Sequence, residues 1–362
     1  MSLATLLWLL LGLAALLVGA ELLVRGASRL AARFGISSLV IGLTVVALGT
    51  SSPEIAVSID ASLAGQGDIA LGNVIGSNIF NVLVILGLSA LITPLLVQQQ
   101  LVRLDVPLMI GVCVLAWLFS LDDALGRVDG MVLLAIAVAY TLFLIIKGRQ
   151  EMPGDDDGAE DDVKPESWVV QVLLIGAGLG LLVAGAGWLV ESAVAIARSF
   201  GVSELVIGLT IIAAGTSLPE VATSVMAALR GERDIAVGNV VGSNLFNIMA
   251  VLGLASLIAP GGIAVREAVQ EFDFPIMIAV AVACLPIFFT GNLISRWEGA
   301  LFLAYYVVYV TWLLLSATGS AVTETYADAL IFFAIPLTFV TLAIFGMREW
   351  QARHPKMPYQ DR

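Results

Sequence analysis

An internal repeat constrains this chain more than any other feature. Residues 42–94 align with residues 208–260 at a constant offset of 166, and 31 of the 53 aligned positions are identical. Each copy holds a polar core in apolar sequence. Gly-Thr-Ser-x-Pro-Glu ends at Glu54 and Glu220, and Gly-Asn-x-x-Gly-Ser-Asn-x-x-Asn ends at Asn81 and Asn247. Such a repeat indicates two copies of one structural unit, each with a carboxylate in apolar surroundings.

The composition predicts a membrane protein. Hydrophobic residues make up 59% of the chain, charged residues 13%, and the mean hydropathy is +1.00. Apolar runs recur at the length of about 20 residues that a helix needs to cross a bilayer core of about 30 Å. The expected spans are 3–23, 38–64, 69–92, 104–121, 128–147, 168–190, 203–229, 235–258, 272–290, 297–315 and 328–346. The first is read as part of the repeat and not as a cleaved signal peptide, because no Lys or Arg precedes it.

Each repeat has five spans, which is an odd number. The second copy should therefore have the opposite orientation in the membrane, as in many secondary transporters. Cytoplasmic loops carry most Lys and Arg. With the N-terminus outside, the inner side receives 14 of the 17: Arg25, Arg29, Arg33, Arg103, Lys147, Arg149, Lys164, Arg230, Arg233, Arg296, Arg348, Arg353, Lys356 and Arg362. The outer side receives Arg127, Arg198 and Arg266. We therefore expect an all-α polytopic membrane protein with two inverted-topology repeats of five transmembrane helices, one extra C-terminal transmembrane helix, and a cytoplasmic C-terminus.

This organisation divides the chain into four parts. We expect a first five-helix repeat at 1–150, an acidic cytoplasmic linker at 151–167, a second, inverted five-helix repeat at 168–316, and the extra helix with a basic cytoplasmic tail at 317–362. The linker is interpreted as a solvated connector, with a weak regulatory calcium site as the alternative. Cys113 and Cys284 lie in separate apolar spans and are expected to pack without a disulfide.

The first motif predicts a broken helix. Glycine weakens a helix, and Pro53 suits the first turn of a new one, so one helix should end near Gly49 and another should begin near Pro53. Such a break frees backbone carbonyls, which is tolerated at membrane depth only where they line a polar cavity or bind something. Glu54 and Ser58 then share one helix face, as do their counterparts in the second copy.

The second motif predicts a polar stripe in each copy. Asn73, Ser77 and Asn81 recur every four residues, and Asn239, Ser243 and Asn247 repeat them. The glycines of this motif, at positions 72, 76, 238 and 242, are expected to let another helix pack closely. The duplicated Asp68 and Asp234 begin their helices and are expected to be N-caps.

The central carboxylates point to a cation. A charged residue at the centre of a membrane helix costs about 2.5–3.5 kcal/mol, and no Lys or Arg lies in the central parts of the spans to neutralise Glu54 or Glu220. A cation would supply the missing charge; protonated, hydrogen-bonded carboxyls are the alternative. All candidate ligands are oxygens, which suit Ca²⁺ and Na⁺. The only histidine, His354, lies in the tail, and neither cysteine is near the motifs, which disfavours Zn²⁺ or Cu⁺.

At these motifs the chain resembles the sodium/calcium exchanger branch of the calcium/cation antiporter superfamily. The resemblance implies an alternating-access antiporter with a central ion site built by the second, third, seventh and eighth spans, across which the first and sixth spans slide. It implies that Glu54 and Glu220 are the main ligands and bridge the calcium and sodium positions. By match of motif, the other ligands would be Thr50, Ser51, Ser77, Asn81, Thr216, Ser217, Ser243 and Asn247, with carbonyls from Ala47 and Ala213.

One departure from the family pattern concerns charge. Some relatives have aspartate at the position of Asn81 or Asn247, whereas this chain has asparagine at both. Two carboxylates neutralise one Ca²⁺ or two Na⁺. A third Na⁺ would leave the loaded site positive and would make exchange electrogenic.

The expected function is Na⁺-driven Ca²⁺ export across the plasma membrane of a prokaryote, with Ca²⁺, Na⁺ and the lipid bilayer as partners. No cofactor is expected beyond the transported ions, and neither nucleic acid nor an obligate protein partner is indicated. The main alternative is an H⁺/Ca²⁺ antiporter that uses the same carboxylates. An intramembrane enzyme is disfavoured, because the motifs hold no nucleophile or metal triad, and a passive cation channel is the remaining alternative.

Overall fold

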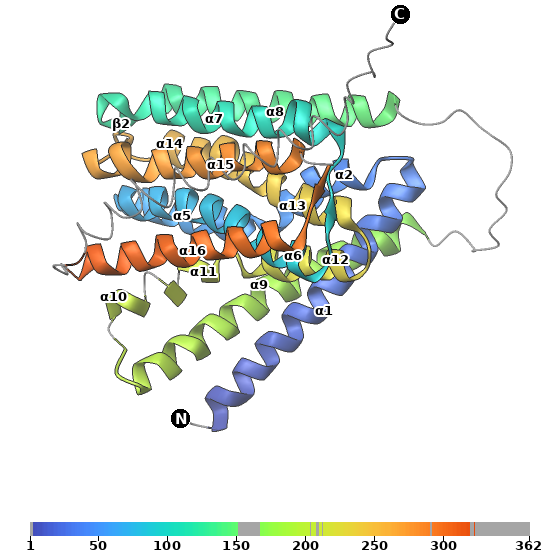
Figure 1. Ribbon diagram of the computed structural model, residues 1–362, viewed down its shortest axis with the longest axis horizontal. Helices are drawn as coiled ribbons and strands as arrows, with labels where there is room; N and C mark the ends of the chain where they lie inside the picture. The colour runs from blue at the N-terminus through green and yellow to red at the C-terminus, as the bar shows by residue number, and fades with distance from the viewer. Residues whose placement is uncertain are drawn as a thin grey trace, which may run out of the picture.

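The computed structural model describes residues 3–150, 167–202, 204–207, 210–211, 213–289, 292–318 and 322. Almost all of this part is helical (Figure 1). Within it, seven helices are long and apolar enough to cross a membrane, or eight if one bent pair counts as a single span. The chain is therefore an all-α polytopic membrane protein. The predicted eleventh span at 328–346 and nearly all of the acidic linker lie outside the described residues.

The first half runs from α1 to α8, with π-helical turns labelled η except for η4, which is a 3-10 turn. Its elements are α1 (Leu3–Phe34), α2 (Ser38–Ile41), η1 (Gly42–Val46), α3 (Ala47–Thr50), α4 (Ser52–Leu63), α5 (Gly67–Phe80), η2 (Asn81–Leu86), α6 (Gly87–Ile92), β1 (Leu95–Leu96), η3 (Leu101–Asp105), α7 (Val106–Phe119), η4 (Ser120–Asp122), β2 (Ala124–Leu125) and α8 (Arg127–Gln150).

The second half repeats this order. Its elements are α9 (Trp168–Ser199), α10 (Glu204–Ile207), α11 (Ala213–Gly215), α12 (Leu218–Leu229), α13 (Arg233–Phe246), η6 (Asn247–Leu252), α14 (Gly253–Ile258), β3 (Ile263–Ala264), η7 (Val269–Asp273), α15 (Phe274–Phe289), β4 (Leu293–Ile294) and α16 (Arg296–Ala317). Helices α1 and α9 each have 32 residues and extend well beyond the expected spans 3–23 and 168–190.

Helices α1 and α9 pack side by side and antiparallel (Figure 1). A Cβ atom added to Gly12 would lie 2.9 Å from the carbonyl oxygen of Gly185, one added to Gly19 would lie 2.8 Å from that of Gly178, and one added to Gly26 would lie 3.0 Å from that of Gln171. Only glycine allows the two backbones to approach so closely. Residue numbers rise along α1 as they fall along α9, and these helices open the two halves, so the halves have inverted topology.

The last helix of each half packs against the other half. A Cβ on Gly87 of α6 would lie 2.9 Å from the carbonyl oxygen of Gly299 in α16, and one on Gly130 of α8 would lie 2.5 Å from that of Gly253 in α14. Two short antiparallel ribbons, β1 with β4 and β2 with β3, also join the halves. The repeats are thus interlocked around one hydrophobic core.

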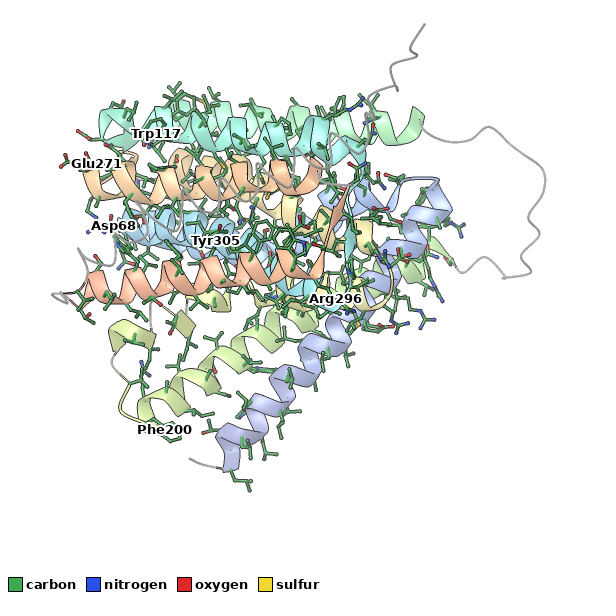
Figure 2. The ribbon with its side chains drawn as sticks, in the orientation of Figure 1. Asp68, Trp117, Phe200, Glu271, Arg296 and Tyr305 are labelled. Carbon is green, nitrogen blue, oxygen red and sulfur yellow. The ribbon has the colours of Figure 1, made fainter. Side chains whose placement is uncertain are left out.

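Polar contacts between the two halves lie at both ends of the helix bundle. At one end, Arg230 forms an ion pair with Glu21, and Arg296 donates to the Ile92 carbonyl at 3.3 Å. At the other end Asp68 pairs with Arg266 at 2.8 Å. Figure 2 shows Asp68 and Glu271 at this second end, with Arg296 displaced toward the first.

Two smaller predictions have clear outcomes. Cys113 and Cys284 are free and buried, as expected. The N-cap role of Asp68 and Asp234 is wrong, because the N-caps of α5 and α13 are Gln66 and Glu232. The aspartates lie in the first helical turn, where Asp68 pairs with Arg266 and Asp234 accepts a hydrogen bond from Gln98 at 2.7 Å. Their carboxylates bind the opposite half instead of their own helix ends.

Candidate ion-binding site

Each repeat contains a helix break just before its glutamate. Helix α3 ends at Thr50, α4 begins at Ser52 with Pro53 in its first turn, and the two segments are bent by 45°. In the second half α11 ends at Gly215 and α12 begins at Leu218, again with proline in its first turn. The predicted break is confirmed in both copies, and it places Glu54 and Glu220 in the first turn of a new helix.

The two glutamates are held by hydrogen bonds that cross between the halves. Ser51 Oγ donates to Glu220 Oε1 at 3.2 Å, and Ser217 Oγ donates to Glu54 Oε1 at 3.1 Å. Both carboxylates are only 1% exposed. Each carboxylate is therefore bonded by the serine that precedes the other carboxylate by three residues, which brings both motifs into one buried site.

The threonines of the two motifs also bond across the halves. Thr50 Oγ1 donates to Asn239 Oδ1 at 3.1 Å, and Thr216 Oγ1 donates to Asn73 Oδ1 at 3.3 Å. The amide nitrogen of Asn73 in turn donates to the Glu54 carbonyl at 3.1 Å. Asn239 does the same for the Glu220 carbonyl at 3.4 Å. The asparagines of the predicted stripe thus support the backbone of each glutamate.

The remaining predicted hydroxyl and carbonyl ligands lie at the same place. Ser77 Oγ donates to Glu54 Oε1 at 3.5 Å and lies 3.2 Å from Ser217 Oγ. Ser243 Oγ donates to the Ala47 carbonyl at 3.5 Å. Ala213 is the first residue of α11, and its side chain is not among those described. The structure therefore gathers the other predicted residues, and places Ala213 on the helix that leads into the second break.

The central asparagines meet where α5 and α13 end and the π-helical turns η2 and η6 begin. Asn81 Nδ2 donates to Asn244 Oδ1 at 3.0 Å, and Asn247 Nδ2 donates to Asn78 Oδ1 at 3.1 Å. π-Helical turns inside α-helices are often found at functional sites. Asn78 and Asn244 were not among the predicted site residues, although both stand inside the duplicated motif.

Four buried oxygens at this site accept no hydrogen bond from any group that the structure describes. They are Glu54 Oε2, Glu220 Oε2, Asn81 Oδ1 and Asn247 Oδ1. Most buried polar atoms in proteins have a hydrogen-bond partner, so such atoms need an explanation. All four are acceptors, they form two pairs related by the repeat, and neither glutamate pairs with Lys or Arg in the described part of the chain. This arrangement is suited to a bound cation.

The second repeat is covered more completely than the first. Gly238 and Gly242 are buried, and Cβ atoms added to them would lie 3.0 Å from the Leu39 carbonyl oxygen and 2.7 Å from the Leu43 carbonyl oxygen. Gly72 is exposed and Gly76 is partly exposed, with no described atom within 4 Å of either added Cβ. Close packing was predicted for all four glycines and is observed for two. Among the described residues, α5 is therefore less covered at its glycines than α13.

The ungapped comparison of the two halves missed a further duplicated acid. The pattern Asp-x-Pro-x-Met-Ile occurs at 105–110 and again at 273–278, with an offset of 168. The extra residues Gly261 and Gly262 break the offset of 166, so an ungapped comparison ends before this pattern. Asp105 is fully buried and accepts a hydrogen bond from Tyr140 at 2.9 Å. A comparison that allows one gap would have found it.

Comparisons with known proteins identify the family. The model of the sodium/calcium exchanger protein family matches residues 4–146 and 170–315, which cover both halves. The putative antiporter CaxA of Alkalimonas amylolytica is 41% identical over 308 residues, 83% of this chain and 96% of that protein. The inner membrane protein YrbG of Escherichia coli strain K12 is 42% identical over 290 residues, 79% of this chain and 89% of that protein.

A solved structure supports the same assignment. The sodium-calcium exchanger NCX_Mj is 33% identical to this chain and superposes with a TM-score of 0.74, covering 86% of this chain and 99% of NCX_Mj. The family consists of transporters and not of enzymes. The match extends over both inverted halves and over the duplicated motifs that meet at the buried glutamates, and the chain therefore belongs to the sodium/calcium exchanger protein family.

Proposed function

We propose that this protein exchanges Na⁺ for Ca²⁺ across the plasma membrane of a prokaryote by alternating access, with Glu54 and Glu220 sharing the central ion site. Family membership supports cation antiport with Ca²⁺ as a substrate. The assignment of the site rests on four buried acceptor oxygens that receive no hydrogen bond, two from carboxylates and two from amides.

The proposed ligand set matches the chemistry of both ions. Ca²⁺ takes six to eight oxygens at about 2.3–2.6 Å in flexible geometry. The four acceptor oxygens without donors would be the central ligands of the ion. The hydroxyls of Thr50, Ser51, Ser77, Thr216, Ser217 and Ser243 and the carbonyls of Ala47 and Ala213 would complete it. The two ions need the same oxygens and cannot occupy the site together, so one must leave before the other binds. Exchange follows from this competition.

The position of the α1–α9 pair supports alternating access. A Cβ added to Gly49, beside the first helix break, would lie 2.8 Å from Leu179 of α9, and one added to Gly215, beside the second break, would lie 2.5 Å from Val190 of the same helix. Perfect two-fold symmetry would place Leu13 of α1, the counterpart of Leu179, beside Gly215. The pair therefore contacts the two halves of the core asymmetrically, as expected for one of two related states that open the site to opposite sides.

Glu54 and Glu220 would provide the negative charges of the transport cycle. Two carboxylates balance one Ca²⁺, whereas Asn81 and Asn247 contribute neutral oxygens. In the alternative, an H⁺/Ca²⁺ antiporter, the same two carboxylates would bind protons in place of Na⁺. Both versions need Glu54 and Glu220, and they differ in the ion that returns.

The test is uptake of radioactive calcium into sodium-loaded proteoliposomes after dilution into sodium-free buffer. Glu54→Gln and Glu220→Gln should each abolish uptake, because the amide removes one of the two charges that balance Ca²⁺. Asp60→Asn is the matched control, since Asp60 is an exposed acid on the same helix as Glu54. Uptake driven by a proton gradient in the absence of sodium would show that H⁺, and not Na⁺, is the coupling ion. Uptake retained in either glutamine variant would refute the ion site shared by Glu54 and Glu220.

A further inference from the structure

Four asparagines meet at the crossing of α5 and α13. Asn78 and Asn244 are related by the repeat, and each donates its Nδ2 hydrogen to the backbone carbonyl of the other, at 3.3 and 3.2 Å. Their Oδ1 atoms accept from Asn247 and Asn81, respectively. All four side chains are buried, with exposed fractions of 0 to 2%.

We propose that Asn78 and Asn244 are positioning residues, which turn the carbonyl oxygens of Asn247 and Asn81 toward the transported ion. The inference rests on the proposed function, in which those two oxygens are ligands. It assigns a role to residues that do not themselves contact the ion.

A backbone carbonyl determines the orientation of each side-chain amide. A backbone carbonyl can only accept a hydrogen bond, so Asn244 must face the Asn78 carbonyl with its nitrogen. Its Oδ1 is then directed to Asn81 and can only accept, which obliges Asn81 to present its own nitrogen there. The Oδ1 of Asn81 is left free. The Asn78 carbonyl thus determines the orientation of the Asn244 amide, and the Asn244 amide determines the orientation of the Asn81 amide.

The same chain of hydrogen bonds runs in the opposite half. The Asn244 carbonyl fixes the orientation of the Asn78 amide, and Asn78 Oδ1 fixes the orientation of the Asn247 amide. The Oδ1 of Asn247 is left without a hydrogen bond. An asparagine turned by 180° would place two N–H hydrogens where the ion needs an oxygen, and an amide nitrogen cannot bind a cation. Correct orientation is therefore as necessary for binding as the presence of the asparagine itself.

A positioning role makes a prediction that a purely structural role does not. Groups that orient a metal ligand typically contribute about 10-fold to 100-fold to metal affinity. Asn244→Ala and Asn78→Ala should therefore raise the Ca²⁺ concentration for half-maximal uptake by at least about 10-fold. Ser256→Ala is the control, because Ser256 is fully buried in α14 and bonds only to the Leu252 carbonyl of its own helix.

The decisive comparison uses an aspartate at the ligand position. The two oxygens of a carboxylate are equivalent, so Asp needs no partner to choose between them. In an Asn81→Asp background, Asn244→Ala should cause no further rise in the half-saturating Ca²⁺ concentration, and Asn78→Ala should behave likewise in an Asn247→Asp background. If Asn244 served only to hold the helices together, its removal would weaken uptake equally in both backgrounds.

A second variant guards against loss of folding in the alanine series. Asn244→Asp keeps an acceptor for Asn81 but loses the donor to the Asn78 carbonyl. Its Ca²⁺ binding, measured by calorimetry on the purified protein, should be no weaker than that of the parent. Weaker binding, or an equal effect of Asn244→Ala in both backgrounds, would overturn the positioning role. A parent protein that fails to bind or transport Ca²⁺ would refute the proposed function itself, which is a separate result.

Discussion

Ser51 donates a hydrogen bond to Glu220 at 3.2 Å, although 169 residues separate them along the chain. Ser51 is the residue at the bend between α3 and α4, and Glu220 lies in the first turn of α12. The mirror contact, from Ser217 to Glu54, has nearly the same length. Each half therefore completes the carboxylate site of the other, and neither half can build the site alone.

The serine contacts predict a position-specific effect. Ser51→Ala should raise the half-saturating Ca²⁺ concentration by about 10-fold, because it removes a hydroxyl that orients Glu220 and that, in the proposed site, supplies an oxygen to the ion. Ser52→Ala is the control, since the neighbouring Ser52 is exposed and its hydroxyl lies near only the Leu48 and Gly49 carbonyls of the preceding helix α3. Uptake measured over a range of calcium concentrations would test this. Equal effects of the two substitutions would contradict the role of Ser51.

The close packing of α1 on α9 predicts a stability difference between two glycines. In Gly178→Ala the new methyl group would meet the Gly19 carbonyl at 2.7 Å, and such overpacking typically costs about 1–3 kcal/mol. Gly176→Ala should be neutral or slightly stabilising, because nothing lies within 4 Å of that position. Thermal unfolding in detergent would compare them. If Gly178→Ala unfolded at the parental temperature, the close backbone contact would be wrong.

Sliding of the α1–α9 pair predicts that a crosslink to the core stops transport. A disulfide between Gly49→Cys and Leu179→Cys would tie α3 to α9, so oxidation should abolish uptake and reduction should restore it. Each single variant, Gly49→Cys or Leu179→Cys, is the control, because it cannot form this crosslink and oxidation should leave its uptake unchanged. Transport by the oxidised Gly49–Leu179 protein would exclude the sliding motion.

A third Na⁺ bound at a site with only two carboxylates would make the transport cycle respond to membrane potential. Exchange of three Na⁺ for one Ca²⁺ moves one net positive charge with the sodium. Calcium uptake into sodium-loaded vesicles should then accelerate when the interior is made positive with potassium and valinomycin, and should slow when it is made negative. Initial rates of uptake measure this. Rates that do not change with the imposed potential would show that the exchange is electroneutral.

The Asp105–Tyr140 contact predicts a loss of stability without a loss of ion affinity. Tyr140→Phe removes a hydrogen bond to a buried carboxylate, which should lower the free energy of unfolding by about 1.5–3 kcal/mol. Asp105→Asn should be milder, since its amide oxygen still accepts from Tyr140. Unfolding in detergent and calcium titration of uptake would be measured together. A shifted half-saturating Ca²⁺ concentration would place this pair in the transport machinery instead.

Some features could be read from the chain because they depend on local chemistry. The helix break at Gly49 to Pro53 follows from backbone propensities, and its duplication at the second glutamate follows from the repeat. The inverted order of the halves follows from an odd number of spans, and the antiparallel contact of α1 with α9 confirms it. The N-cap role of Asp68 failed for a tertiary reason, because the loop of the opposite half supplies Arg266 as its partner.

The sequence by itself determined that two acidic motifs lie in apolar helices and need a cation or hydrogen-bond donors, since an unpaired carboxylate in such surroundings is costly. Only the tertiary structure decided which serine serves which glutamate, and which oxygen of Asn81 and Asn247 remains free. Those contacts join residues more than 160 positions apart. They depend on how the two halves cross, and a pattern within one half contains no information about the direction in which a side-chain amide of the other half will point.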